Sequence, residues 1–429
     1  MKRITTIIML VLFTSVLISG AVFAEDEFVA TIHEPAESDV IAPEDIEDAR
    51  FQVWLDYMNE ELSSEQLNSE ISEYAMQFGD ATMRFTLNMK GDMPDDGYPL
   101  YIAMHGGGES SAAENDEQWE EMEEYYFDDL DCGVYVAVRG VRDTWDTHFN
   151  PESYPLYDRL IRYLILTHDV DPNRVYLEGF SAGGDGVYAI ANRMADRFAA
   201  ANMSSGHPNG ISMLNLYNLP IQLQAGEFDD AFDRNKITAE YGLQLDKLEE
   251  EFSGGYIHRT LIHYEAGHNY EDYAPQPIPV MTDIRAWLEN GDRSHTDVDS
   301  FPPHFMEQYT RDPLPKMVVW DLSTRAPSRE TEAFYYLTAP YSTDQGVIYA
   351  SYDPEANVVA VNTQGVEGEF GILLNEEMID FTQPVTIVVN DAEYVFEPQP
   401  DRALLVETTA DRGDRSYQFE SCVYVKPVN

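Results

Sequence analysis

Two glycine-rich segments, each directly after an apolar run, constrain this chain more than any other feature. His105–Gly108 reads HGGG and follows the run 99–104, and Gly179–Gly183 reads GFSAG and follows the run 174–178. Glycines on both sides of Ser181 permit a tight turn from a strand into a helix, which lifts the serine hydroxyl clear of the backbone. A glycine-rich loop after a neighbouring strand directs backbone N–H groups at the same point. GFSAG alone is weak evidence, but both segments in this order predict one catalytic device.

Ser181 is the candidate nucleophile, and a serine nucleophile needs a base and an orienting acid. The acid is expected just after a strand that follows the nucleophile helix and one further strand. The run 219–225 predicts that strand, and Asp229 follows it. Asp230 and Asp233 are the alternatives, because in so acidic a chain a given aspartate is usually solvated surface.

The base is expected in a loop after the last strand of the same sheet. The run 260–264 predicts this strand, and His268 follows it in a loop that contains a glycine. His263 is the alternative, but it falls inside the strand, where a side chain more often packs. The resulting order of serine, aspartate and histidine is one of the orders in which this triad occurs.

Backbone donors for an oxyanion are expected from both glycine-rich segments. The N–H of Ala182, the residue after the nucleophile, is the first donor, and that of Gly106 or Gly107 is the second. His105 is expected to brace the HGGG loop rather than to take part in the reaction.

Three further side chains are candidates for substrate contact. Trp145 and His148 follow the apolar run 134–138, whose carboxyl end should open on the same rim, and His207 is in a similar position. Structural packing is the alternative for these residues. No histidine, cysteine or carboxylate grouping has metal-ligand spacing, and no glycine loop is typical of a phosphate or dinucleotide site. The sequence therefore predicts neither a metal nor a cofactor.

Short β-like runs alternate with helical segments from residue 81 to about residue 290, which is typical of a mostly parallel sheet flanked by helices. The predicted strands are 82–89, 100–104, 134–138, 175–178, 199–203, 221–225 and 260–264. The predicted helices are 154–167, 185–197, 236–252 and 279–289. These elements predict an α/β catalytic domain over residues 81–293.

The flanking segments have different patterns. Residues 25–80 begin as an acidic arm, expected to be mobile or to wrap the surface, and continue with apolar residues at the spacing of one or two helices that pack on the core. Residues 294–315 have no periodicity and predict a linker. About eight β-like runs and no convincing helix follow in 316–429, one of them at 404–407, and predict a small β-sandwich.

The first 24 residues have the pattern of an export signal. Lys2 and Arg3 precede an apolar run from Ile4 to Ile18, and a small-residue cleavage site ends at Ala24. An uncleaved anchor helix is the alternative, because the run nearly reaches membrane-spanning length. We expect cleavage, a secreted or periplasmic protein, and no stable membrane insertion afterwards.

The chain is strongly acidic, with 78 Asp and Glu against 26 Lys and Arg and a formal net charge of −52. Such a surface repels nucleic acid, anionic membranes and polyanionic polymers, and it favours neutral or cationic substrates. Adaptation to high salt and an ordinary acidic exported protein both fit this composition. Cys132 and Cys422 are the only cysteines. Two separate buried thiols are expected, with a bridge between domains as the alternative.

The segments 99–108, 171–184, 226–229 and 267–268 resemble secreted α/β-hydrolases of the dienelactone hydrolase, prolyl oligopeptidase and polyhydroxybutyrate depolymerase or feruloyl esterase grouping. The resemblance implies an α/β-hydrolase fold, to which the C-terminal all-β sandwich-like domain would be accessory. It also implies hydrolysis of a small or polymeric ester through an acyl-enzyme. A serine peptidase and an inactive binding protein on a hydrolase scaffold are the alternatives. Glu109 departs from the pattern and argues against an anionic substrate.

Overall fold

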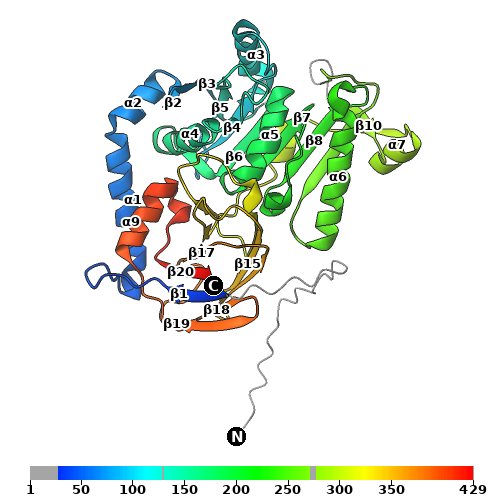
Figure 1. Cartoon of the computed structure of the whole chain (residues 1–429). Coiled ribbons are helices and arrows are strands. Elements are labelled where there is room, and N and C mark those ends of the chain that lie inside the picture. The colour runs from blue at the N-terminus through cyan, green and yellow to red at the C-terminus, as the bar shows by residue number, and fades with distance from the viewer. Residues whose placement is uncertain (1–27, 128–129, 271–276, 429) are drawn as a thin grey trace.

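A ten-stranded sheet with helices on both faces forms the upper part of the molecule, and two five-stranded sheets lie below it (Figure 1). The computed structural model describes residues 28–127, 130–270 and 277–428. The predicted signal segment 1–24 therefore lies outside the described residues. Within the described ranges, no helix combines the length and the apolar character that crossing a membrane requires.

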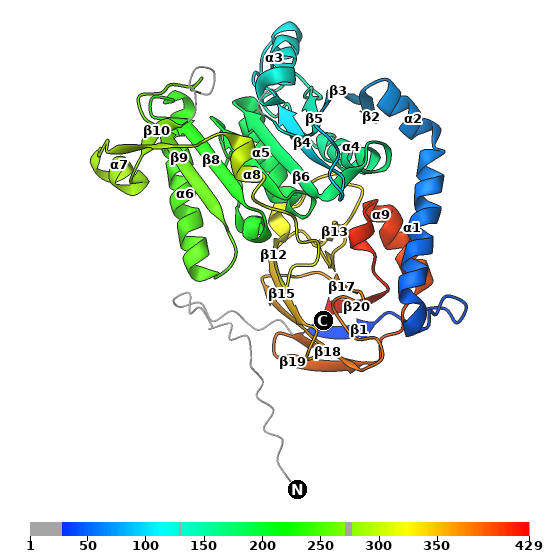
Figure 2. The ribbon, with the colours of Figure 1, turned by 180° about the vertical axis from the view of Figure 1, so that it is seen from behind.

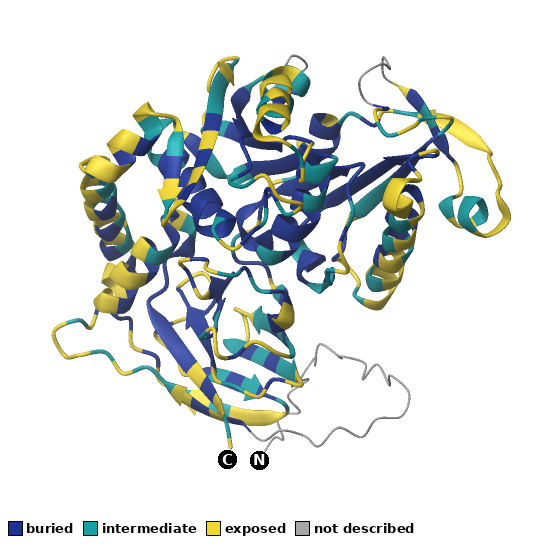
Figure 3. Cartoon of the chain, turned by 45° about the horizontal axis from the view of Figure 1, so that its top comes forward, coloured by how far each residue is buried: buried dark blue, intermediate teal, exposed yellow. Residues whose placement is uncertain are grey.

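The large sheet carries the elements that position the site. Its strands in spatial order are β11 (His295–Val298), β10 (Ile278–Met281), β9 (His258–His263), β8 (Ile221–Gly226), β7 (Ala200–Ser204), β6 (Val170–Phe180), β4 (Tyr98–Met104), β5 (Gly133–Val138), β3 (Ala81–Lys90) and β2 (Ala75–Phe78). The strands from β9 to β5 pair in parallel, and the flanking strands pair antiparallel. All residues of β5 and β8 are buried, as expected for strands that are covered on both faces (Figure 3).

The direction in which strands are added to this sheet changes at β4. The chain passes from β4 to β5 on one side and then returns to β6 on the other side of β4. In open α/β sheets, a crevice forms outside the carboxyl ends of the strands at such a point. HGGG follows β4, and GFSAG spans the end of β6 and the start of α5 (Ala182–Arg193). The topology therefore brings the two segments to one crevice.

The helices complete an α/β-hydrolase fold, which confirms the predicted fold class. α4 (Ser153–Thr167), α5 and α6 (Arg234–Glu251) occur where the sequence predicts helices. The predicted helix 279–289 is wrong in its first part, which belongs to strand β10, and only α7 (Ile284–Asn290) is helical. Residues 278–281 form a strand because they pair with β9 and β11. Periodicity alone does not distinguish a short buried strand from a helix, so the sequence could not show this.

Two segments without a clear apolar pattern also form elements. α3 (Ala112–Tyr125) follows the HGGG loop and has no counterpart among the predicted helices. β11 and α8 (Pro302–Met306) lie within the predicted linker 294–315. β11 is an edge strand with mostly exposed residues, so pairing with β10 rather than burial stabilises it, and its sequence shows no alternation.

Two five-stranded sheets form the C-terminal part, in agreement with the predicted all-β region. The first contains β1 (Phe28–Ile32), β20 (Ser421–Pro427), β17 (Phe370–Leu374), β14 (Leu337–Thr338) and β13 (Ala333–Phe334). The second contains β12 (Met317–Asp321), β15 (Val347–Asp353), β16 (Val358–Gln364), β18 (Val385–Val389) and β19 (Ala392–Phe396). Both sheets contribute to one continuous cluster of buried apolar side chains.

The two ends of the chain differ from their predictions. The N-terminal arm contains strand β1, which pairs along its length with β20 at the other end of the chain, a contact that no local pattern can show. Residues 404–407, predicted as a β run, lie inside helix α9 (Arg402–Arg412), which Asp401 caps. α1 (Ile46–Leu62) and α2 (Glu65–Ser72) lie where the sequence predicts one or two helices, but α1 packs mainly on α9 rather than on the core of the large sheet.

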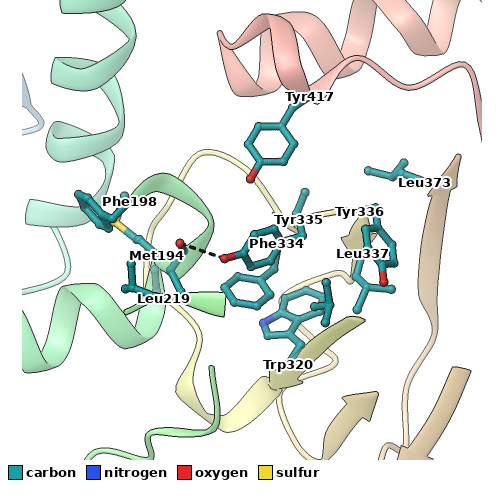
Figure 4. Close-up of a cluster of buried hydrophobic side chains, with 14 of the residues drawn as sticks. Met194, Phe198, Leu219, Trp320, Phe334, Tyr335, Tyr336, Leu337, Leu373 and Tyr417 are labelled. Carbon is teal, nitrogen blue, oxygen red and sulfur yellow. Dashed lines mark hydrogen bonds between the residues drawn. The ribbon is translucent and has the colours of Figure 1, made fainter. Parts of the chain in front are cut away.

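The part of the chain with the α/β-hydrolase fold (residues 75–298, called the hydrolase part) and the part that follows it (residues 311–427, called the C-terminal part) meet in a buried junction. Figure 4 shows its apolar side chains, which are Met194, Phe198 and Leu219 from the hydrolase part and Trp320, Phe334, Tyr335, Tyr336, Leu337, Leu373 and Tyr417 from the C-terminal part. The Tyr335 hydroxyl donates a hydrogen bond of 3.2 Å to the Ala195 carbonyl across the junction.

Buried charges lie at the same junction. We call them the junction cluster, and its members are Asp158, Asp196, Arg197, Arg311, Arg329, Arg412 and Asp414. Their side chains are at most 4% exposed. Arg329 donates to both oxygens of Asp196, at 3.0 and 3.2 Å, and Arg412 also donates to this carboxylate. These ion pairs join the two parts of the molecule.

The two cysteines are separate free thiols, as expected. Cys422 is buried in β20, and burial raises the pKa of its thiol to about 12. Cys132 lies just before β5 and is only partly buried, which corrects the expectation that both thiols are buried.

Candidate active site

Ser181 occupies the sharp turn between β6 and α5. Its backbone has φ 57° and ψ −116°, a conformation that a residue with a side chain rarely adopts. A Cβ added to Gly179 would lie 2.4 Å from the Gly183 carbonyl oxygen, and one added to Gly183 would lie 2.0 Å from the Met104 carbonyl oxygen. The turn therefore tolerates no side chain at either glycine, which explains both glycines of GFSAG.

The structure brings the three predicted triad side chains together. His268 Nε2 lies 3.0 Å from Ser181 Oγ, and His268 Nδ1 lies 2.9 Å from Asp229 Oδ2. These three residues come from the carboxyl ends of β6, β8 and β9, which are close because the strands are parallel. The arrangement is that of a nucleophile, a base and an orienting acid.

The alternative residues occupy other positions. His263 is buried, with Nε2 3.0 Å from Gln224 Oε1 and its ring stacked on Tyr270. Asp230 is exposed, and Asp233 lies 3.7 Å from Lys236 in an exposed ion pair. Among the candidates, only Asp229 and His268 have contacts that connect them to Ser181.

Backbone contacts hold the loops of the acid and the base against each other. The Phe228 N–H donates to the Ala266 carbonyl at 2.8 Å, and the Ser205 hydroxyl donates to the His268 carbonyl at 3.0 Å. Ser205 directly follows β7, so the loop after β7 also helps to hold His268 in place. Fixed loops keep the imidazole in register with the nucleophile without help from substrate.

Arg234, which the sequence analysis did not single out, contacts both the acid and the base. Its Nε lies 3.2 Å from Asp229 Oδ1, and its Nη2 lies 3.2 Å from His268 Nδ1. Burial acts to raise the pKa of Asp229, but hydrogen bonds and charges from His268 and Arg234 outweigh it and lower this pKa. The acid therefore remains ionised at neutral pH. The sequence gives one indication of this role: Arg234 is a basic residue five positions after Asp229 in a chain with few basic residues.

His105 braces the HGGG loop as a neutral ring. Burial lowers the pKa of His105 to about 4. The Gly140 N–H donates to His105 Nε2 at 3.1 Å, so Nδ1 carries the proton and donates to the Gly106 carbonyl at 2.5 Å. Because the C=O and N–H of one trans peptide point in opposite directions, this bond turns the Gly107 N–H away from His105.

Two of the residues predicted to supply oxyanion donors, Gly106 and Ala182, adjoin Ser181. The Asn115 side chain accepts from the Gly108 N–H at 2.9 Å and donates to its carbonyl at 3.0 Å, which fixes the loop. Gly106 borders the serine, since a Cβ on it would lie 3.4 Å from Ser181 Cβ. Ala182 is the first residue of α5, where N–H groups lack an acceptor within the helix.

A pocket open to solvent adjoins Ser181, with about 490 Å³ of empty space when the open solvent at its mouth is included. Its lining residues are Gly106, Gln118, Glu121, Met122, Tyr125, Phe180, Ser181, His268 and Asn269. Four of these side chains come from α3, so the wall opposite the triad is the helix that the sequence analysis missed. Few apolar residues mark this helix in the sequence, since only Trp119, Met122 and Tyr125 lie among its acidic residues.

The three predicted contact residues are absent from this lining. His148 is fully buried, its Nε2 lies 2.9 Å from the His105 carbonyl oxygen, and burial lowers its pKa. It supports the HGGG loop, so its prediction as a substrate contact is wrong. Trp145 is exposed, and its ring packs on that of Phe149. His207 Nδ1 lies 3.0 Å from Asn209 Oδ1.

Comparisons with known proteins find likenesses in structure only. No family model matches the sequence, and curated proteins give no sequence match. A poly(3-hydroxybutyrate) depolymerase from Bordetella parapertussis aligns over 48% of this chain and 88% of its own, with 15% identity and a TM-score of 0.37. A Bacillus cereus carboxylesterase aligns over 48% of this chain and 92% of its own, with 16% identity and a TM-score of 0.32. A thermostable esterase aligns over 56% of this chain and 64% of its own, with 18% identity and a TM-score of 0.36.

Proposed function

We propose that this protein is a serine hydrolase that cleaves carboxylic esters, and that it is exported by its N-terminal segment. The proposed enzymatic activity rests mainly on one observation. A continuous pair of hydrogen-bond contacts runs from Asp229 through His268 to the hydroxyl of Ser181, which stands on a strained turn beside backbone donors. Strain of this kind is concentrated at functional sites.

The reaction begins when His268 Nε2 accepts the proton of Ser181 as Oγ attacks the ester carbonyl carbon. Asp229 accepts a hydrogen bond from Nδ1–H and stabilises the imidazolium that forms. The N–H groups of Ala182 and of Gly106 or Gly107 stabilise the oxyanion. Fixed donors of this kind each contribute about 10²- to 10³-fold to kcat.

The tetrahedral intermediate collapses when the bond from carbon to the leaving oxygen breaks. The imidazolium of His268 donates its proton to that oxygen, and the alcohol leaves. A water molecule then gives a proton to His268 and attacks the acyl-enzyme. The bond from carbon to Ser181 Oγ breaks in the second tetrahedral intermediate, His268 returns the proton to Oγ, and the acid is released.

A fluorophosphonate probe tests the proposal directly, because it reacts with an activated serine. We expect the native protein to be labelled and Ser181→Ala not to be. p-Nitrophenyl esters should be hydrolysed much faster than peptide anilides. Absence of labelling in the folded native protein would support an inactive scaffold, and faster cleavage of anilides would indicate a peptidase.

A further inference from the structure

The helix that forms one wall of the pocket is strongly anionic. α3 reads AAENDEQWEEMEEY, in which seven of 14 residues are acidic and none is Lys or Arg. Figure 1 shows this helix at the top of the molecule, and it packs against β5, where the Tyr135 hydroxyl donates to the Met122 carbonyl at 2.7 Å. Arg84 and Arg139 pair with Asp116, at 2.5 and 2.8 Å, but Glu120, Glu121, Glu123 and Glu124 form no ion pair within the described part of the chain. A cleft wall with charge of one sign concentrates ligands of the opposite sign.

The pocket combines this charge with aromatic surfaces. The rings of Tyr125 and Phe180 lie 5.9 Å apart between centroids, and Phe180 lies 5.0 Å from the ring of His268. The Glu121 carboxylate accepts one hydrogen bond, of 2.9 Å, from Gln118 and has capacity for more. Aromatic faces beside a carboxylate are the surroundings that an organic cation prefers.

The pocket has little positive charge to oppose such a ligand. Among its lining residues, only His268 can be protonated to a cation, and the mechanism requires it to be neutral before attack. The nearby Arg234 contacts Asp229 on the Nδ1 side of the imidazole, whereas Ser181 lies on the Nε2 side. Its charge is therefore balanced by the acid of the triad.

We propose that this pocket selects esters that carry a cationic group, such as a quaternary ammonium, on the part of the substrate that lies between α3 and Phe180. The proposal rests on the proposed ester hydrolysis and adds the substrate class to it. Glu121 is the one carboxylate among the residues that line the pocket, and Tyr125 and Phe180 provide the aromatic faces.

Pairs of esters with the same shape and different charge test this selection. Acetylcholine and 3,3-dimethylbutyl acetate place the charge in the alcohol, and the ethyl esters of betaine and 3,3-dimethylbutyrate place it in the acyl group. Each kcat/KM is divided by the rate constant for hydroxide-catalysed hydrolysis, which removes differences in intrinsic reactivity. At low salt we expect the cationic member of at least one pair to be favoured by about tenfold, from one partly exposed charge pair and a cation–π contact.

Two changes should reduce this ratio. Glu121→Gln should lower it to about threefold, because only the aromatic contribution and the weaker field of the helix remain. Salt at about 1 M should lower it in the native protein, because the Debye length falls to about 3 Å. Glu120→Gln is the matched control, because Glu120 is exposed on the same helix and does not line the pocket, so the ratio should stay near the native value.

The outcomes separate this inference from the proposed function. Hydrolysis of both members of each pair at equal normalised rates would overturn the selection and leave the esterase proposal intact. A ratio that Glu120→Gln and Glu121→Gln reduce equally would overturn the role of Glu121. Failure to hydrolyse any of the four esters, together with no fluorophosphonate labelling, would overturn the esterase proposal itself.

Discussion

The catalytic corner, formed by Ser181, Asp229, Arg234 and His268, and the junction cluster both hold buried aspartates against cationic side chains. Asp229 and Asp196 are equally buried, with side chains 1% and 0% exposed. Their partners differ. His268 has a side chain 32% exposed and faces the pocket, whereas Arg329 and Arg412 are sealed in the protein at 3% and 1%.

This difference separates a reactive site from a structural one. His268 has solvent access, and in the proposed reaction it accepts and returns a proton, so the charge at the catalytic corner changes during that reaction. Guanidinium groups are not deprotonated in proteins, so the junction cluster has no group that exchanges a proton in a reaction as an imidazole does. Buried aspartates paired with cationic side chains therefore have two roles in this molecule. At the catalytic corner they support the proposed reaction, and in the junction cluster they hold two parts of the chain together.

Asp229→Asn should have the largest effect, and it should fall on activity. The amide cannot stabilise the imidazolium or the required tautomer, so we expect kcat for p-nitrophenyl esters to drop about 10⁴-fold. The melting temperature should change little by comparison. Asp230→Asn makes the same change at the exposed neighbour and should leave kcat near the native value. Equal losses in both variants would contradict the assignment of the acid.

Asp196→Asn should show the opposite pattern, with the loss in stability. Removing this charge leaves Arg329 and Arg412 buried without a full partner, so the free energy of unfolding should fall by about 3–5 kcal/mol. Chemical denaturation at pH 7 measures this, while kcat of the folded variant should stay close to native. The exposed Asp95→Asn control should shift stability by less than about 0.5 kcal/mol.

The contribution of Asp196 to the free energy of unfolding should decrease as the pH falls. Burial acts to raise the pKa of Asp196, but Arg329, Arg412 and Arg197 outweigh it and lower this pKa. The contribution of the ionised carboxylate is therefore present above the ordinary pKa of about 4 and is lost as pH falls below it. The difference between native and Asp196→Asn should shrink in acid, and a difference that grows in acid would contradict this account.

Glu420 is a buried carboxylate whose one ion pair is long, which makes it a third case beside Asp229 and Asp196. Its substitution should change the free energy of unfolding less than that of Asp196 does. Its side chain is 0% exposed, with Arg50 Nε 3.6 Å away. Burial raises the pKa of Glu420 to about 8 despite Arg50. Folding thus favours the protonated form, and the associated stability is full below the unfolded pKa of about 4.5 and is lost as pH rises towards 8.

Glu420→Gln removes this titration and tests the sign. At pH 9 the variant should be more stable than the native protein by about 1–3 kcal/mol, whereas at pH 5 the two should be similar. Denaturation curves at both pH values measure the difference. The exposed Glu393→Gln control should show no such pH dependence, and a variant that is less stable at pH 9 would show that Arg50 satisfies the charge of Glu420.

Much of the catalytic corner is predictable from sequence because its groups follow local rules. The glycines around Ser181 mark the turn, and Asp229 and His268 each follow a strand of strong apolar pattern. Parallel strands bring such loops to one edge of the sheet. Arg234 and the α3 wall were missed because their roles depend on which loops meet across that edge. His148 was misassigned because position after a strand does not distinguish a buried ring from an exposed one.

Local sequence accounts for the turn at Ser181, for the alternation of strands and helices in the hydrolase part and for the excess of negative charge. These are properties of residues close together in the chain or of composition. Tertiary structure alone decided the pairing of β1 with β20, the helix α9, the junction cluster and the chemistry of the pocket wall. Those features depend on contacts between residues far apart in the chain, such as Asp196 and Arg412, and no local pattern records which distant group will neutralise a buried charge.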